Sequence, residues 1–183
     1  AGHQDFPAYQ RDQALLWIEV QVTCAAAATA PLLVRSRHGL FEGIDGRFVV
    51  RQDSDCTRLS VTSGNVAIHS PHTADGLFTQ VHAGESYLVR QNEAILAPPL
   101  DMDAGAWADG LIVTRNMRLA DFLAEVGRYR HGYLGCSSDI ADLRLSGVFR
   151  LEDPEKLLAI LPQTLPVRLR YRTRWWVSLE RQA

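Results

Sequence analysis

Apolar and polar residues alternate with a period of two through much of the first hundred residues. The clearest stretches lie at residues 16–22, 58–62, 66–68 and 87–89. This period is typical of strands that bury one face. Glycines at candidate turn or bulge positions separate the stretches: Gly39, Gly43, Gly46, Gly64, Gly76 and Gly84. Since no helical period occurs between residues 31 and 99, we predict an all-β unit over residues 1–104. It would hold about seven or eight short strands, with a solenoid-like or sandwich-like arrangement.

The pattern changes after residues 97–105, a segment with two prolines, two aspartates and a glycine that we interpret as a linker. Beyond it, apolar residues spaced three and four apart predict a helix, with Asn116 as its N-cap and Gly132 as its stop. The residues of this apolar stripe are Leu119, Phe122, Leu123 and Val126. Alternation over residues 143–151 then predicts a strand.

A second helix is predicted to start at Asp153-Pro154-Glu155, where an oxygen can cap the helix and proline takes the first position. Pro162 limits this helix. Alternation returns over residues 167–171 and 175–179, which indicates a hairpin that turns near residues 172–174. Residues 105–183 therefore form a small α+β unit with two helices, and the chain as a whole is predicted to be α+β.

Composition and charge narrow the class of protein. The 183 residues carry a net charge of −2, with 46% apolar and 22% charged residues, as in ordinary globular chains. No apolar run approaches the ~20 residues of a membrane span. A pI near 6.3 gives no support for nucleic-acid binding. Lys156 is the only lysine among 19 basic residues, so the positive charge is carried almost entirely by arginine.

Motifs for catalysis, cofactors or metals are not evident in the sequence. Neither a nucleophile motif nor a phosphate-binding or dinucleotide-binding loop is present. His69, His72 and His82 could be considered as metal ligands, but Pro71 interrupts the strand on which they would lie. The spacings of Cys24, Cys56 and Cys136 match no zinc or redox motif, and the three can form at most one disulfide among themselves. We therefore expect no enzymatic activity, cofactor or metal.

An arginine row is the most distinctive charge feature. Arg168, Arg170, Arg172 and Arg174 alternate with other residues and would share one strand face. That face is either simply solvated or a docking surface for an acidic partner. Of the two adjacent tryptophans that follow, we expect Trp175 in the core and Trp176 exposed as an interface anchor.

Several segments of the second unit resemble the periplasmic part of FecR-type sigma regulators. They are residues 106–111, 117–125, 128–130, 145–149 and 153–158. This pattern resembles the short secretin/TonB N-terminal (STN) module found at the C-terminus of that family, in its PupR-like, iron-siderophore branch. In the first unit, residues 31–34, 38–39, 47–51, 58–61, 64–66 and 81–85 resemble the family's β domain. Residues 43–46 depart from the family's usual Ala-Leu-Gly-Thr.

The resemblance implies a role in cell-surface signalling. The chain would be the excised periplasmic region of a single-pass inner-membrane protein of a Gram-negative bacterium. It would bind the N-terminal signalling domain of a TonB-dependent outer-membrane transducer of ferric siderophores. The signal would pass to a cytoplasmic extracytoplasmic-function (ECF) sigma factor through the cytoplasmic segment that this chain lacks. Periplasmic and intramembrane proteases are further partners that the family implies.

Two surfaces are candidates for the docking of that partner. We favour the edge strands of the β unit, with Trp17, Phe41 and Phe48 as anchors, because an edge can accept another strand. The second candidate is the arginine row with Trp176, through Arg168, Arg170 and Arg172. Two other functions stay open: a self-associating envelope-assembly module of the secretin or pilus type with an STN fold, and a metal-binding or enzymatic β protein built on the three histidines.

Overall fold

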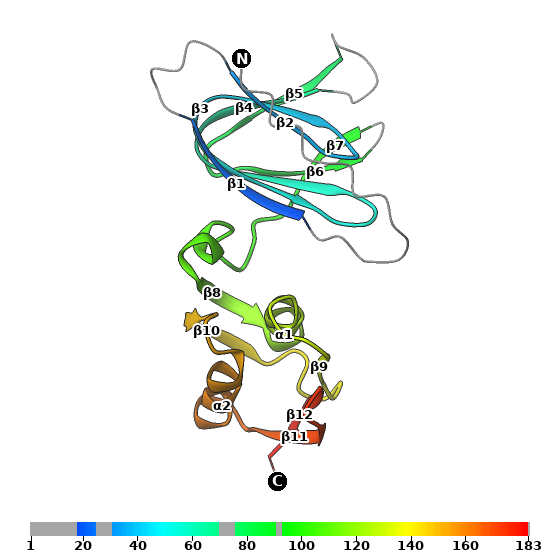
Figure 1. The fold of residues 1–183 in the computed structure, drawn as a ribbon, viewed down its shortest axis with the longest axis vertical. Coiled ribbons are helices and arrows are strands. Elements are labelled where there is room, and N and C mark those ends of the chain that lie inside the picture. The colour runs from blue at the N-terminus through cyan, green and yellow to red at the C-terminus, as the bar shows by residue number, and fades with distance from the viewer. Residues whose placement is uncertain (1–17, 25–30, 70–75, 91–92, 183) are drawn as a thin grey trace. The chain divides into compact units, whose positions relative to one another are not determined.

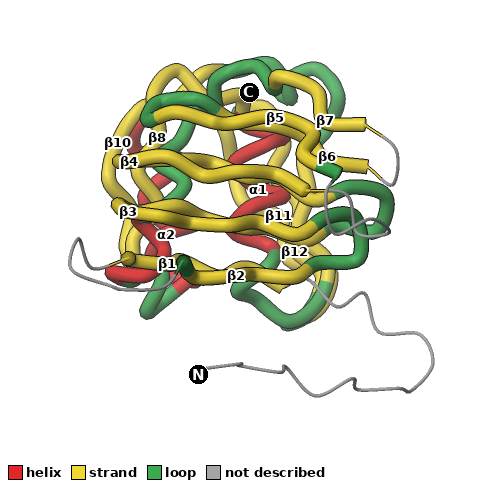
Figure 2. The backbone as a smooth tube through the Cα atoms, turned by 90° about the horizontal axis from the view of Figure 1, so that it is seen from above, coloured by secondary structure: helices red, strands yellow, loops and turns green. Residues whose placement is uncertain are grey.

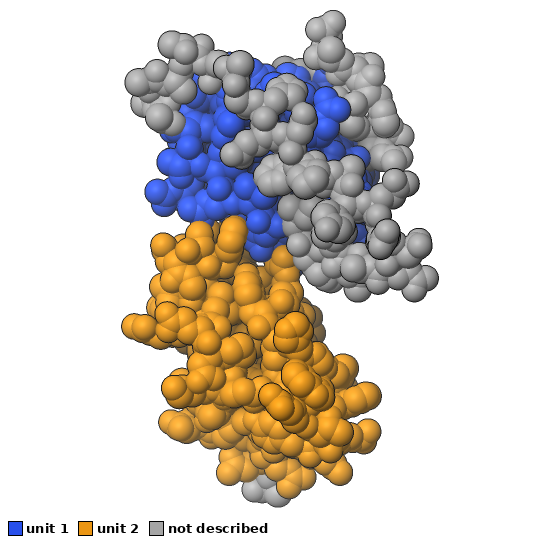
Figure 3. Space-filling view, in the orientation of Figure 1, with its two compact units in different colours: residues 1–97 blue, residues 98–183 orange. Residues whose placement is uncertain are grey.

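The computed structural model describes residues 18–24, 31–69, 76–90 and 93–182 of the chain. It divides into two compact units, residues 1–97 and 98–183, which Figure 3 colours separately. The division lies inside the segment 97–105, whereas the boundary placed from the sequence follows residue 104. Residues 98–103 already belong to the second unit, since Met102 forms a β-bridge with Thr114. With mostly strands and two α-helices, the fold is α+β.

Unit 1 is one antiparallel sheet of seven described strands (Figures 1 and 2). The strands are β1 (Ile18–Cys24), β2 (Leu32–Arg35), β3 (Leu40–Gln52), β4 (Thr57–His69), β5 (Leu77–His82), β6 (Ser86–Arg90) and β7 (Glu93–Leu96). The β3–β4 hairpin forms the centre, with β1 and β2 beside β3, and β5 and β6 beside β4. β7 pairs with β6. The described part of this unit contains no helix, as the sequence predicts.

The central strands are longer than the short strands predicted from the sequence, because glycines allow each strand to continue through a bulge. β3 and β4 have 13 residues each. Gly46 and Gly64 lie opposite each other with φ angles of 87° and 76°. A Cβ atom on Gly46 would lie 2.0 Å from the carbonyl oxygen of Ser63. Only glycine tolerates both this backbone angle and this approach.

The core of unit 1 comes from the alternating apolar positions of its strands. Phe41 and Phe48 are fully buried in it, and the other members are Val22, Val50, Leu59, Val61, Val66, Ile68, Val81 and Val89. Beside this core, the turn that leads into β3 holds the buried His38, whose Nδ1 lies 3.0 Å from the Thr57 hydroxyl. Burial lowers the pKa of His38; Arg37 lowers it further, and Asp55 opposes the shift.

Unit 2 places two helices between two sheets (Figure 1). Its elements are the 3₁₀ helix η1 (Ala106–Asp109), β8 (Leu111–Arg118), α1 (Leu119–Gly127), β9 (Tyr133–Cys136), β10 (Arg144–Arg150), α2 (Pro154–Thr164), β11 (Val167–Thr173) and β12 (Trp176–Arg181). β8 and β10 form an antiparallel pair. In the second sheet, β12 is the central strand, antiparallel to β11 and parallel to β9. α1 contacts β8 and β9, and α2 contacts β10 and β11, so each helix joins both sheets.

The predicted start of α2 is confirmed, whereas its predicted end is wrong. The Asp153 carboxylate accepts a hydrogen bond from the Lys156 amide at 3.1 Å, and Pro154 is the first helical residue. The helix continues past Pro162 to Thr164, and the Leu165 amide still donates to the Leu161 carbonyl. Proline removes one amide donor, but the helix continues because the residues after Pro162 keep their own amide hydrogen bonds.

Both predicted limits of α1 are wrong. Asn116 lies within β8 with a φ angle of 54°, and Arg118 occupies the N-cap position. At the other end, the Arg128 amide donates to the Glu125 carbonyl three residues earlier, and this tight turn ends the helix before Gly132. The apolar stripe itself is confirmed, since its four residues are buried.

The core of unit 2 fills the space between the sheets and the helices. Phe149 is partly buried and packs against it, with its ring centroid 4.7 Å from that of Phe122. The buried members are Ile112, Met117, Leu119, Phe122, Leu123, Val126, Ile140, Leu145, Leu157, Leu158, Leu161, Val167 and Leu179. Among the described residues, neither helix has the length and apolar character needed to cross a membrane.

Candidate functional site

The three-stranded sheet of unit 2 has two chemically different faces. One face packs against the core and the helices through Leu134, Cys136, Val167, Leu169, Val177 and Leu179. The other, which we call the open face, carries Tyr133 and Gly135 from β9, Trp176, Ser178 and Glu180 from β12, and Arg168, Arg170 and Arg172 from β11. The strand register places all of these residues except Arg172 together, because cross-strand partners share a face. Arg172 lies where the register shifts between Tyr171 and Thr173, and its guanidinium reaches this face at the Trp176 ring.

Aromatic side chains cover one end of the open face. Tyr133 and Trp176 remain 50% and 44% exposed, and their ring centroids lie 4.7 Å apart. The Tyr133 ring lies over Gly135, where a Cβ atom would come within 2.4 Å of the phenolic oxygen. The guanidinium of Arg172 lies 5.7 Å from the centre of the Trp176 ring, within cation–π range. Two large exposed rings and one guanidinium group therefore contact one another on this face.

Positive charge dominates the other end of the open face. Arg168 donates to Glu180 Oε2 at 3.1 Å and Arg170 donates to Glu180 Oε1 at 2.8 Å. The hydrogen bond from Arg170 lowers the pKa of Glu180, desolvation opposes the shift, and the hydrogen bond from Arg168 lowers the pKa further. The open face therefore carries three guanidinium groups and one carboxylate.

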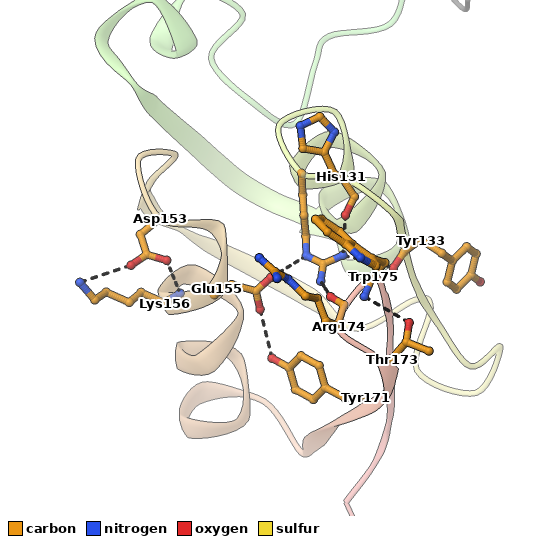
Figure 4. Close-up of polar contacts among 10 residues, drawn as sticks. His131, Tyr133, Asp153, Glu155, Lys156, Tyr171, Thr173, Arg174 and Trp175 are labelled. Carbon is orange, nitrogen blue, oxygen red and sulfur yellow. Dashed lines mark hydrogen bonds and ion pairs between the residues drawn. The ribbon is translucent and has the colours of Figure 1, made fainter.

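The turn between β11 and β12 is tied to the rest of unit 2 by Arg130, whose side chain is only 5% exposed. Its guanidinium donates to the Arg174 carbonyl at 2.9 Å, to the His131 carbonyl at 3.2 Å and to Glu155 Oε1 at 2.8 Å. The other Glu155 oxygen accepts a hydrogen bond from Tyr171 at 3.3 Å (Figure 4). One buried side chain thus connects α2, the chain before β9 and the hairpin turn.

Trp175 lies on this turn and not in the core, so the prediction from strand parity was wrong. Its side chain is 52% exposed, with the Arg174 guanidinium 4.8 Å from the ring centre. The register of β11 and β12 shifts between Tyr171 and Thr173, and β12 starts only at Trp176. Since parity holds only along an uninterrupted strand, it could not place a residue in the turn.

The anchors suggested for unit 1 are not on its surface, as far as the structure describes them. Phe41 and Phe48 are fully buried and complete the core, which leaves no ring surface for a partner. Trp17 lies outside the described residues. The exposed large apolar residues near the β2–β3 edge are instead Leu32, Leu33 and Ile44. The sequence signal for the first two was weak, because Pro31-Leu-Leu-Val34 does not alternate.

The histidines considered as metal ligands have other partners. His69 Nε2 lies 2.8 Å from Glu42 Oε2, and His82 Nδ1 lies 2.7 Å from Asn65 Oδ1. His72 lies outside the described residues. Within the described ranges, no cluster of three or more histidine, cysteine or acidic side chains could hold a metal ion. All three cysteines are free thiols, and burial raises the pKa of each.

Comparison with known proteins shows which solved structures have a similar fold. No protein-family model and no curated protein matches the sequence. Two crystal structures of a "putative anti-sigma factor" from Parabacteroides distasonis ATCC 8503 are similar to the chain, with TM-scores of 0.60 and 0.61. Each match covers 90% of this chain and 78% of that protein, at 17% sequence identity. The chain therefore has an anti-sigma-factor-like fold that extends over both of its units.

Proposed function

We propose that the chain is the periplasmic receiver region of a transmembrane regulator of an ECF sigma factor. The observation that carries this proposal is the likeness in fold to the Parabacteroides distasonis protein over 90% of the chain. The FecR-like motifs in both units point to the same class of regulator. The partner would be the N-terminal signalling domain of a TonB-dependent outer-membrane transducer, and the signal would be a ferric siderophore.

The mechanism would be differential binding and not catalysis. A partner shifts a regulator between two states only as far as it binds one state more tightly than the other. The open face supports such a role, since it combines exposed aromatic rings with arginine side chains. Release or activation of the sigma factor would follow across the inner membrane, with periplasmic and intramembrane proteases as further partners.

Calorimetric titration of the chain with the isolated signalling domain of a transducer from the same genome tests this function. We expect one-to-one binding with a Kd near 1 μM or tighter, which corresponds to about −8 kcal/mol. Transducer domains from other siderophore systems serve as controls and should not bind. Absence of binding to any transducer domain, with both proteins folded, would contradict the proposal. Concentration-dependent ring formation would then favour an envelope-assembly module.

A further inference from the structure

The open face concentrates positive charge on a chain whose net charge is negative. The chain carries −2 overall, yet this face presents Arg168, Arg170 and Arg172 against the single carboxylate of Glu180. Among the described residues, Arg172 contacts Trp176 and has no carboxylate partner. A surface of this charge attracts acidic partners and repels basic ones.

The aromatic end of the same face is suited to bind a partner at low entropic cost. The few residues that contribute most of the binding energy at protein interfaces are enriched in tryptophan, tyrosine and arginine. Here Trp176 and Tyr133 are exposed but already contact each other, with Tyr133 close to Gly135 and Arg172 close to Trp176. Side chains fixed before binding lose little rotamer freedom when a partner arrives.

Glu180 gives the arginine end a particular role. It holds Arg168 and Arg170 with one oxygen each, so both guanidinium groups are oriented in the free protein. It also competes with any incoming carboxylate for those same groups. An acidic partner would therefore meet Arg172 first and share the other two arginines with Glu180.

We propose that the open face is the surface on which the signalling domain of the transducer docks, through an acidic patch with an adjacent apolar side chain. The carboxylates would bind at Arg168, Arg170 and Arg172, and the apolar side chain would pack on Trp176 and Tyr133. This inference rests on the proposed function, because it names the surface that receives that partner.

Titrations of variants of the 183-residue chain with the same signalling domain test the inference. Trp176→Ala and the double variant Arg170→Ala/Arg172→Ala should each weaken binding about tenfold or more. The control is Arg115→Ala/Arg150→Ala, which removes the same charge from exposed positions of the two-stranded sheet and should change Kd less than about threefold. The affinity of the wild-type chain should also fall with added salt, and that of the arginine variant should fall less.

A gain-of-affinity variant strengthens the test. Glu180→Gln should tighten binding at low salt at least about twofold, since it removes the negative charge that pairs with two guanidinium groups. Unchanged or weaker binding by this variant would overturn the competing role of Glu180. Melting curves establish that each variant is folded.

The outcomes separate the two proposals. Wild-type binding with no loss in either open-face variant would overturn the docking surface and leave the proposed function standing. Absence of wild-type binding would overturn both proposals.

Discussion

Replacing Arg130 with methionine would remove a buried guanidinium group while keeping most of the side-chain volume. In the native structure, this group donates to the carbonyls of Arg174 and His131 and to the carboxylate of Glu155. Methionine offers no donor, so both carbonyls lose a partner at a site where the arginine side chain is 5% exposed. The turn between β11 and β12 would then be attached to unit 2 mainly by its strand pairing.

The expected loss in the free energy of unfolding follows from the hydrogen bonds and the ion pair that Arg130 makes. Hydrogen bonds from a charged donor contribute about 1.5–3 kcal/mol each, and two that share one donor group are not additive. The Glu155 side chain is 54% exposed, so its ion pair with Arg130 contributes at most about 1 kcal/mol. We therefore expect Arg130→Met to lower the free energy of unfolding of unit 2 by about 2–4 kcal/mol.

Urea denaturation followed by tryptophan fluorescence measures this change. Trp107, Trp175 and Trp176 lie in unit 2, so the signal reports mainly on that unit. Arg115→Met, at an exposed position of β8, is the matched control and should cost less than about 0.5 kcal/mol. A loss below about 1 kcal/mol for Arg130→Met, with an unchanged m-value, would refute the reasoning, because it would mean that water replaces the guanidinium at little cost.

The remaining predictions concern single residues of both units. Phe149→Ala should lower the free energy of unfolding by about 3 kcal/mol, and a wild-type urea midpoint would show that this ring is not part of the core. Gly132→Ala should cost more than about 2 kcal/mol, because its Cβ would lie 2.1 Å from the Trp175 carbonyl oxygen. Gly110 also has a positive φ angle, but a Cβ atom there would meet no other atom within 4 Å. Gly110→Ala should therefore cost less, and equal melting temperatures for the two alanine variants would contradict a steric cause. Because burial lowers the pKa of His38 below 6.5, the unfolded state binds more protons just below pH 6.5. Unit 1 should therefore lose stability as the pH falls from 6.5 towards the lowered value. Melting curves at pH 7.5 and 5.5 measure this change. The melting temperature of His38→Gln should fall less between the two pH values than that of the wild-type chain, and an equal fall would exclude His38 as the cause.

Elements with local signals were predictable from the sequence. The start of α2 depends on Asp153, Pro154 and the amide of Lys156, which are all within one helical turn. Such a cap forms from neighbouring residues and needs no information about the rest of the fold. The hairpin near residues 172–174 and the apolar stripe of α1 are likewise properties of short stretches.

Elements that depend on distant contacts were not predictable in the same way. The first amide of α1, at Leu119, donates to the carbonyl of Leu143, a residue that sequence spacing does not connect with it. Gly64 looked like the end of a strand, but it continues β4 because Gly46 lies opposite it. The open face was predictable in its arginines and in Trp176, but not in Tyr133, which joins them through the parallel pairing of β9 with β12.

The central place of β12 in its sheet has a consequence for the order of folding. β9 precedes its partner by about forty residues, and β12 is the last strand of the described chain. A ribosome would therefore release β9, α1, β10 and α2 before the strand that β9 and β11 both need. Until that strand emerges, the facing edges of β9 and β11 stay unpaired and the core of unit 2 lacks Leu179. Unpaired strand edges and exposed apolar surface make a nascent chain prone to aggregation. The open face would thus be completed only after the other described elements of unit 2 have been synthesised.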